Sequence, residues 1–214
     1  MNNKEINMYN SKEDQEMDKL LNIETTGLIE WPRGVNLDYF RTESSSYKDL
    51  ERLIKHYDFR GYSHLVDYGS GKGRIIFYFN YRLGIPTTGI EVNKVAFSHL
   101  THNLADYKEK FPKKGSDILL SEQKAEDYKV NPTDDIFYFF NPFTISIFEK
   151  VMQKIEQSLE EYPREADIIL YYPGVAYSYY IDKYSSFDLI QTIKNPKYFL
   201  NSRECFKVYR HLPH

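Results

Sequence analysis

Apolar residues recur along this chain in two alternating patterns, short uninterrupted runs and longer stretches with helical spacing. Short apolar runs bounded by polar residues are typical of buried strands, and apolar residues three and four positions apart are typical of amphipathic helices. The predicted strands lie at 64–68, 87–91, 118–121, 135–140 and 167–172. The predicted helices cover 46–57, 74–83, a stretch beginning near Lys94, and a stretch that includes Phe148 and Tyr162.

Strands that alternate with helices predict a parallel sheet with helices on both faces, because each right-handed crossover packs its helix against the sheet. The end of the chain differs, since 187–193 and 204–210 resemble two strands with no helical pattern between them. We therefore expect an α/β, doubly wound fold with a mostly parallel sheet and an antiparallel closing pair. Ser46, three residues before Asp49, predicts a capped start for the leading helix.

The first 45 residues are mostly polar, with one short apolar group at Met17, Leu20 and Leu21. They predict an N-terminal arm that is either frayed or a docking helix, with disorder at its very start and a loop at 31–34. We expect this arm and a covering loop to occupy 1–45 and one α/β domain to occupy 46–214.

Composition narrows the class of protein. The chain has 214 residues, of which 41% are hydrophobic, and no apolar run of membrane-spanning length, so we expect a cytoplasmic protein without a membrane partner. Cys205 is its only cysteine, which excludes a disulfide framework or a cysteine-based zinc site within one chain. A formal charge of −3 disfavours duplex DNA as a partner. The oligomeric state is left open.

A glycine-rich turn follows the first predicted strand directly and precedes a helix, at 65–74. Ligands of open α/β sheets bind at such turns, because glycines let the backbone approach them closely. The spacing disfavours NAD, since Arg74 stands where the dinucleotide pattern needs glycine or alanine, and it disfavours an ATP-binding P-loop, since glycine rather than a hydroxyl residue follows Lys72.

Asp67 stands two positions before Gly69, Gly71 and Gly73, and this pattern resembles the first motif of class I S-adenosylmethionine-dependent methyltransferases, which have a Rossmann-like fold. The resemblance implies S-adenosylmethionine as cofactor and no metal. It implies that Asp67 receives the methionine ammonium group and that the glycine loop, with Ser70, lies under the methionine and ribose. Glu91, at the end of the second strand, is placed to accept both ribose hydroxyls.

Two further segments resemble the same family. Glu126 and Asp127 follow the third predicted strand, where the family has an acidic contact to adenine; an ordinary loop pair explains them equally well. The loop before the leading helix contains Thr42 and Tyr47, with Glu43 between them, and corresponds to a segment that folds over the methionine end, although a serine-rich cap also explains it.

Asn141, Pro142 and Phe143 follow the fourth strand and resemble the motif by which methyltransferases that act on planar amines position the acceptor. The resemblance implies that the Asn141 amide binds the acceptor nitrogen and that the Phe143 ring stacks on it. The motif has one proline where that family has two, and the turn also faintly resembles a motif of non-SET-domain histone lysine methyltransferases. The alternative is that Asn141 and Pro142 simply end a strand and start a helix.

The sequence thus predicts methyl transfer by in-line displacement to an acceptor, and the candidate acceptors are amine nitrogens of a nucleic acid base, as in RNA, of a protein side chain or of a small molecule. Tyr171 and Tyr172, at the end of the fifth strand, are acceptor-side candidates or packing residues. The whole of 47–210 resembles a bacterial methyltransferase group with G-x-G-K-G-R, F-N-P-F and R-E-C motifs, the last at Arg203 to Cys205. Two other functions stay open: a cofactor-binding regulatory module without catalysis, and a domain that binds another nucleotide.

Overall fold

The computed structural model describes residues 11–31 and 38–213. The predicted disorder of the first residues and most of the predicted loop at 31–34 lie outside these ranges. Within the described ranges, no helix is both long and apolar enough to span a membrane.

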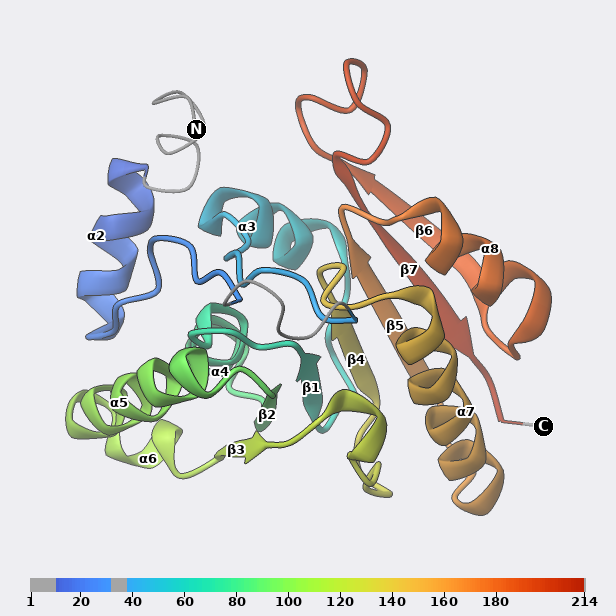
Figure 1. Ribbon diagram of the computed structural model, residues 1–214, viewed down its shortest axis with the longest axis horizontal. Coiled ribbons are helices and arrows are strands. Elements are labelled where there is room, and N and C mark those ends of the chain that lie inside the picture. The colour runs from blue at the N-terminus through green and yellow to red at the C-terminus, as the bar shows by residue number, and fades with distance from the viewer. Residues whose placement is uncertain (1–10, 32–37, 214) are drawn as a thin grey trace.

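One seven-stranded sheet with the order β3-β2-β1-β4-β5-β7-β6 forms the centre of the protein (Figure 1). The first five strands are parallel, and β7 runs antiparallel to both β5 and β6. Their bounds are Leu65–Tyr68 for β1, Thr87–Glu91 for β2, Ile118–Glu122 for β3, Ile136–Phe139 for β4, Ala166–Tyr171 for β5, Asp188–Lys194 for β6 and Cys205–His211 for β7. The predicted fold class is confirmed, including its antiparallel closing strand.

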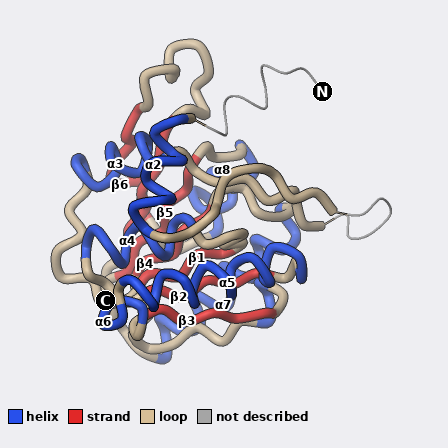
Figure 2. The backbone as a smooth tube through the Cα atoms, turned by 90° about the vertical axis from the view of Figure 1, so that its left-hand side faces the viewer, coloured by secondary structure: helices blue, strands red, loops and turns tan. Residues whose placement is uncertain are grey.

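Helices cover both faces of this sheet (Figures 1 and 2). The main helices are α2 (Lys12–Leu21), α3 (Tyr47–His56), α4 (Arg74–Leu83), α5 (Lys94–Lys110), α7 (Ile145–Glu161) and α8 (Val175–Tyr184). Two short elements, α6 (Pro112–Gly115) and the 3-10 helix η1 (Ala125–Asp127), flank β3. Ser46 caps α3 by accepting a hydrogen bond from the Asp49 amide at 3.2 Å, as its spacing predicts.

Alternate residues of each central strand enter two separate hydrophobic cores. Leu65 of β1 packs in the core beneath α2, α3, α4 and α5, whereas its neighbour Val66 packs in the core beneath α7 and α8. Both are fully buried, which is why the central strands consist almost entirely of apolar residues.

The structure adds one large helix that the sequence analysis did not predict. Helix α8 lies between β5 and β6, and it buries Tyr177, Ser178 and Ile181. Such a narrow buried face gives a weak periodic signal in a segment rich in tyrosine. Within the arm, Lys12–Leu21 forms the helix α2, which is the docking-helix alternative of the sequence analysis.

The strand order reverses between β1 and β4, and this is the point where open α/β sheets bind ligands. Tyr68 at the end of β1 lies opposite Ile90 of β2 and Phe139 of β4. The glycine loop, Glu91 and Asn141 follow these three positions, so the fold brings all three to one edge of the sheet.

Candidate functional site

A cavity of about 620 Å³ opens along this carboxyl edge of the sheet. One end lies over β2 and β3 and is lined by Ile90, Glu91, Val92, Gln123 and Ala125. The other end lies over β4, β5 and the connection between β6 and β7. Gly69 and Pro142 line the cavity between the two ends.

The glycine loop reaches this position through backbone geometry that other residues tolerate poorly. Gly69 has φ of +79°, and a Cβ there would come within 2.4 Å of Pro142 Cβ. Gly71 has φ of +56°, and a Cβ there would come within 2.4 Å of Thr42 Cγ2. The loop is therefore packed between the turn after β4 and the segment before α3, and only glycine fits at these contacts.

Glu91 faces the cavity and also fixes the shape of the glycine loop. One carboxylate oxygen accepts the Gly71 amide at 2.8 Å, and the other accepts the Asn93 amide at 2.7 Å. Burial raises the pKa of Glu91, while these backbone donors act in the opposite direction. Each oxygen can accept a further hydrogen bond, so hydroxyl groups of a ligand could bind there.

Asp67 lies behind the glycine loop, close enough to Glu91 to sense its charge. Its side chain is 3% exposed and is not part of the cavity wall. Burial raises the pKa of Asp67 well above its usual range, and the negative charge of Glu91 raises it further. The two carboxyl groups predicted to bind the cofactor are therefore on the same side of the sheet, with Glu91 in the cavity wall and Asp67 outside it.

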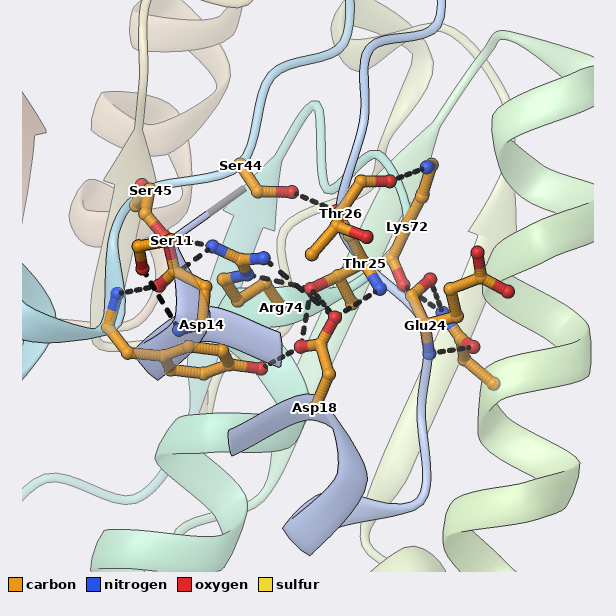
Figure 3. A network of polar contacts seen from close by, with 12 residues as sticks. Ser11, Asp14, Asp18, Glu24, Thr25, Thr26, Ser44, Ser45, Lys72 and Arg74 are labelled. Carbon is orange, nitrogen blue, oxygen red and sulfur yellow. Dashed lines mark hydrogen bonds and ion pairs between the residues drawn. The ribbon is translucent and has the colours of Figure 1, made fainter. Parts of the chain in front are cut away.

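Both basic residues of the glycine loop point away from the cavity, toward the N-terminal arm (Figure 3). Lys72 donates from Nζ to the Thr26 carbonyl. Arg74 is 2% exposed and donates to Thr25 Oγ1 at 2.7 Å and to the Ser45 carbonyl at 3.1 Å. Other groups of the protein thus bind the charged ends of Lys72 and Arg74, and neither residue lines the cavity.

Two aspartates of α2 complete the surroundings of Arg74. Asp14 Oδ1 lies 3.4 Å from Arg74 Nη1, and Asp18 Oδ2 lies 3.8 Å from Arg74 Nη2. Tyr47 donates from its hydroxyl to Asp18 at 2.6 Å, and its ring lies under the guanidinium. We call Asp14, Asp18, Thr25, Tyr47 and Arg74 the Arg74 cluster. Tyr47, predicted to close the cofactor site, belongs to this cluster instead of the cavity wall.

The predicted covering loop does lie over the glycine loop. Thr42 and Glu43 line the cavity, and Thr42 pairs with Ile29 in an isolated antiparallel bridge. The Phe40 amide donates to the Pro142 carbonyl at 2.9 Å, so the loop is also fastened to the turn after β4.

The acidic pair after β3 lies outside the cavity wall. Glu126 accepts a hydrogen bond from the Tyr39 hydroxyl, and Asp127 is exposed. Gln123 and Ala125, which the sequence analysis did not single out, line the cavity there. Ser70 and Gly73 are likewise absent from the wall: the buried Ser70 hydroxyl has no hydrogen-bond partner among the described residues, and Gly73 packs against Leu100.

Asn141 lines the cavity, but its amide is engaged by the loop after β5. Nδ2 donates to the Tyr172 carbonyl, and Oδ1 accepts the Gly174 amide at 3.0 Å. Asn141 and Tyr172 both have left-handed φ values, +41° and +49°, which cluster at functional sites because surrounding structure must hold them. Asn141 thus holds the turn after β4 against the loop after β5 at this end of the cavity.

The aromatic residue of this turn that faces the cavity is Phe140. Phe143 is 1% exposed, lies outside the cavity wall, and packs edge-on against Tyr39 with 5.7 Å between ring centroids. Phe140 contacts Tyr171, and both Tyr171 and Tyr172 line the cavity. The stacking role predicted for Phe143 therefore fits Phe140 better in this arrangement.

Three polar residues that the sequence analysis missed as ligand contacts lie at this end: Asp49, Asn195 and Glu204. Asp49 comes from α3, while Asn195 and Glu204 end the loop between β6 and β7 and are joined by an amide-to-carbonyl hydrogen bond of 2.8 Å. Asp49 was interpreted only as part of a helix cap. Asn195 and Glu204 are brought together by strand pairing, for which no local sequence motif exists.

No family model matches the chain, and no curated protein matches it. Solved structures do. A human methyltransferase 10 domain containing protein has a TM-score of 0.63 at 10% identity, over 99% of this chain and 98% of its own. The glycopeptide N-methyltransferase MtfA, complexed with S-adenosylmethionine, has a TM-score of 0.60 at 10% identity, over 95% and 98%.

An RNA methyltransferase from Salinibacter ruber, in complex with S-adenosyl-L-homocysteine, has a TM-score of 0.51 at 16% identity, over 80% of this chain and 94% of its own. At such identities the likeness establishes the fold. The chain therefore has the Rossmann-like methyltransferase fold.

Proposed function

We propose that the protein is an S-adenosylmethionine-dependent methyltransferase. The main support for this proposal is that the acidic and the basic residues around the glycine loop are directed to different places. Glu91 faces the cavity with Asp67 behind it, whereas Lys72 and Arg74 bind the N-terminal arm. A phosphate-bearing nucleotide needs donors or cations at such a loop, whereas a ligand with a sulfonium and an ammonium group is favoured by carboxylates.

The residues present fit this cofactor. Glu91 has acceptor capacity for the ribose hydroxyls, Ile90 and Val92 provide apolar walls beside it, and Gln123 offers an amide near the adenine end. Asp67 supplies a carboxyl group for the ammonium group, whose positive charge favours the ionised form of that carboxyl. S-adenosylmethionine supplies a methyl carbon on a sulfonium, and that sulfur leaves as a neutral thioether.

The chain's own contribution to the reaction is alignment and exclusion of water. Thr42 and the neighbouring covering loop close the methionine end, and Pro142 lies against Gly69 between the cofactor end and the acceptor end. Phe140 provides an aromatic wall for the acceptor. Asn141 holds the loop at Tyr172 and Gly174, so it sets the width of this end. Alignment of this kind accounts for a large part of catalysis in displacement reactions.

Calorimetry of S-adenosylmethionine, S-adenosylhomocysteine, NAD and ATP tests the cofactor. We expect micromolar binding of the first two, loss of this binding in Asp67→Ala, and retention of binding with lower turnover in Asn141→Ala. Binding of NAD or ATP in place of the adenosyl compounds would contradict the proposal. Binding without transfer of a labelled methyl group to any cell fraction would identify a regulatory module instead.

A further inference from the structure

The charged residues that line the cavity differ by sign in how far they are exposed to solvent. Among the described residues of the lining, the basic ones are all exposed, and they are Arg41, Lys48, Lys197 and Arg203. The acidic ones are all buried or half-buried, and they are Asp14, Glu43, Asp49, Glu91 and Glu204. The cavity therefore presents positive charge to solvent at its rim and carboxyl groups inside.

The exposed cations and the inner carboxyl groups partly offset each other. Arg41 lies 3.3 Å from Glu43, and the positive charge of Lys197 acts against the raised pKa of Glu204. Lys48 forms no ion pair with any residue that the structure describes. What separates the rim from the interior is therefore the sign of the charge that an entering molecule meets at each depth, rather than a net excess of either sign.

Large apolar side chains are exposed on the same segments as the rim cations. Phe40, directly before Arg41, lines the cavity and is 49% exposed. Phe199 and Leu200 lie between the two basic residues of the loop that joins β6 to β7, and they are 91% and 90% exposed. This loop projects beyond the end of the sheet in Figures 1 and 2. Neighbouring exposed apolar side chains beside charged groups mark a surface for a partner.

The interior of the acceptor end fits a flat group that carries N–H donors. Phe140, Tyr171 and Tyr172 give its wall an aromatic character. Asp49 accepts the Tyr171 hydroxyl through Oδ2 at 2.7 Å, which leaves its other oxygen as an acceptor, and Glu204 adds a second carboxyl group. Proteins bind unstacked nucleobases in this way, by stacking on aromatic side chains and by hydrogen bonds to the base edge.

We propose that the methyl acceptor is a nucleobase of a single-stranded nucleic acid, which enters the cavity while the rim cations bind the adjoining phosphates and Phe199 stacks on a neighbouring base. This inference rests on the methyltransferase function proposed above. A duplex fits less well, because its base must first leave the stack and its partner. An acidic peptide matches the rim charge but has no flat bases for the exposed aromatic side chains.

The transfer itself needs only the base and the cofactor. An amino nitrogen of the base bonds to the methyl carbon as the carbon–sulfur bond breaks, and the electron pair of that bond goes to sulfur. The nitrogen then releases one proton to water. The protein's part is to hold the base in line with the methyl group, which the phosphate contacts at the rim and the aromatic wall inside both support.

Fluorescence anisotropy tests this surface on the full chain with S-adenosylhomocysteine present. The probes are mixed-sequence single strands of about 20 nucleotides, longer than one single-strand site, as RNA and as DNA, together with their duplexes and oligoglutamate. We expect one single strand to bind at least tenfold more tightly than its duplex and than oligoglutamate, and the tighter strand identifies the sugar. Equal affinity for the duplex or for oligoglutamate overturns the inference. Calorimetry of S-adenosylhomocysteine tests the proposed function separately.

Two variants locate the contacts. Lys48→Gln should reduce the slope of log affinity against log salt by about 0.7, the value of one phosphate contact on a single strand. Phe199→Ala should weaken binding about fivefold or more without changing that slope. The matched controls are Lys113→Gln, exposed in α6 at the opposite edge of the sheet, and Tyr162→Ala, half exposed at the end of α7. Binding unchanged in both site variants overturns the inference, and calorimetry with S-adenosylhomocysteine confirms that each variant is folded.

Labelled methyl transfer then identifies the accepting group. The strand that binds is incubated with the wild-type protein and S-adenosylmethionine labelled in its methyl group, and it is then digested to nucleosides. We expect the label on a base. Label on the ribose, or no label in a strand that binds, overturns the assignment of a base to the cavity, whereas label in a protein fraction alone contradicts the acceptor class and leaves the methyltransferase proposal intact.

Discussion

Two polar regions flank the cavity, and they differ in how many of their polar atoms have partners within the protein. In the Arg74 cluster a buried cation meets two buried carboxylates, a hydroxyl and a backbone carbonyl (Figure 3). Arg74 Nη2, which lies 3.8 Å from Asp18 Oδ2, has no hydrogen bond among the described residues. At the other end of the cavity, both polar side-chain atoms of Asn195 lack a hydrogen-bond partner among the described residues, and Lys197 offsets part of the charge of the half-buried Glu204. Burying polar groups costs less when partners are present, so the Arg74 cluster is expected to contribute more to stability than the Asn195 side chain does.

The largest expected effect comes from a substitution in the Arg74 cluster. Arg74→Met leaves Asp14 and Asp18 buried without their cation, and removing one partner of a buried ion pair costs about 3–5 kcal/mol. Urea denaturation measures the loss in the free energy of unfolding. Arg82→Met is the control, because Arg82 pairs with Glu51 near the surface, where a pair contributes about 0–1 kcal/mol.

A compensating variant separates charge from packing. Adding Asp14→Asn and Asp18→Asn to Arg74→Met should recover part of the lost stability, because the uncompensated charges are then gone. If Arg74→Met alone is as stable as the wild type, the Arg74 cluster does not have the structural role described above.

A smaller effect is expected at Glu91, a buried carboxylate that accepts two backbone hydrogen bonds and also lines the cavity. Glu91→Gln keeps the shape of the side chain but replaces a charged acceptor by a neutral one, and charged hydrogen bonds contribute about 1.5–3 kcal/mol. Calorimetry should show S-adenosylmethionine affinity about 10–100-fold lower. An unchanged affinity would mean that the cofactor does not contact this carboxylate.

A stabilising change is expected at Asn195. Asn195→Leu replaces a buried amide without side-chain hydrogen bonds by an apolar group of similar size, which should raise the free energy of unfolding by about 1 kcal/mol. Asn103→Leu is the matched control. Asn103 is also buried but makes three hydrogen bonds, to the Glu24 amide, the Glu24 carbonyl and the Lys72 carbonyl, so this change should destabilise the protein. Destabilisation by both changes would remove the distinction between the regions.

The smallest expected effect is the pH dependence that Glu204 contributes. Because burial and Asp49 raise its pKa in the folded state, the folded protein binds this proton more tightly than the unfolded chain does. The resulting destabilisation is full above the raised pKa and disappears as pH falls through it toward the usual glutamate value. Unfolding measured at several pH values should therefore show Glu204→Gln more stable than wild type at neutral pH, with the gap closing on acidification. A constant gap would exclude this titration.

The sequence was sufficient to predict the sheet, its closing pair and the edge of the sheet at which the glycine loop lies, because these depend on local signals. Buried strands appear as apolar runs, and the glycine loop needs glycines for its positive φ values and close contacts at Gly69 and Gly71. The contacts at the acceptor end of the cavity depend instead on tertiary structure. Asn195 and Glu204 meet only because β6 and β7 pair, and Phe140 rather than Phe143 faces the cavity because of how the backbone turns at Asn141.

Tyr47 shows why even a well-placed residue can be misassigned from sequence. It lies at the start of α3, directly after the covering loop, as expected. Its hydroxyl nevertheless binds Asp18 of a helix that begins 35 residues earlier in the chain. The polarity of that helix suggested an exposed arm, whereas its aspartates are buried against a cation from the glycine loop.

The dependence of helix α2 on later residues constrains how the protein folds during synthesis. The segment that follows α2 is hydrogen-bonded to Asn103, 79 residues downstream of Glu24. At translation rates of about 5–20 residues per second, those partners emerge from the ribosome roughly 4–16 s after the segment itself. During that interval α2 meets its partners in stages, because Tyr47 and Arg74 emerge before Asn103 does, so the segment that follows the helix is fixed last.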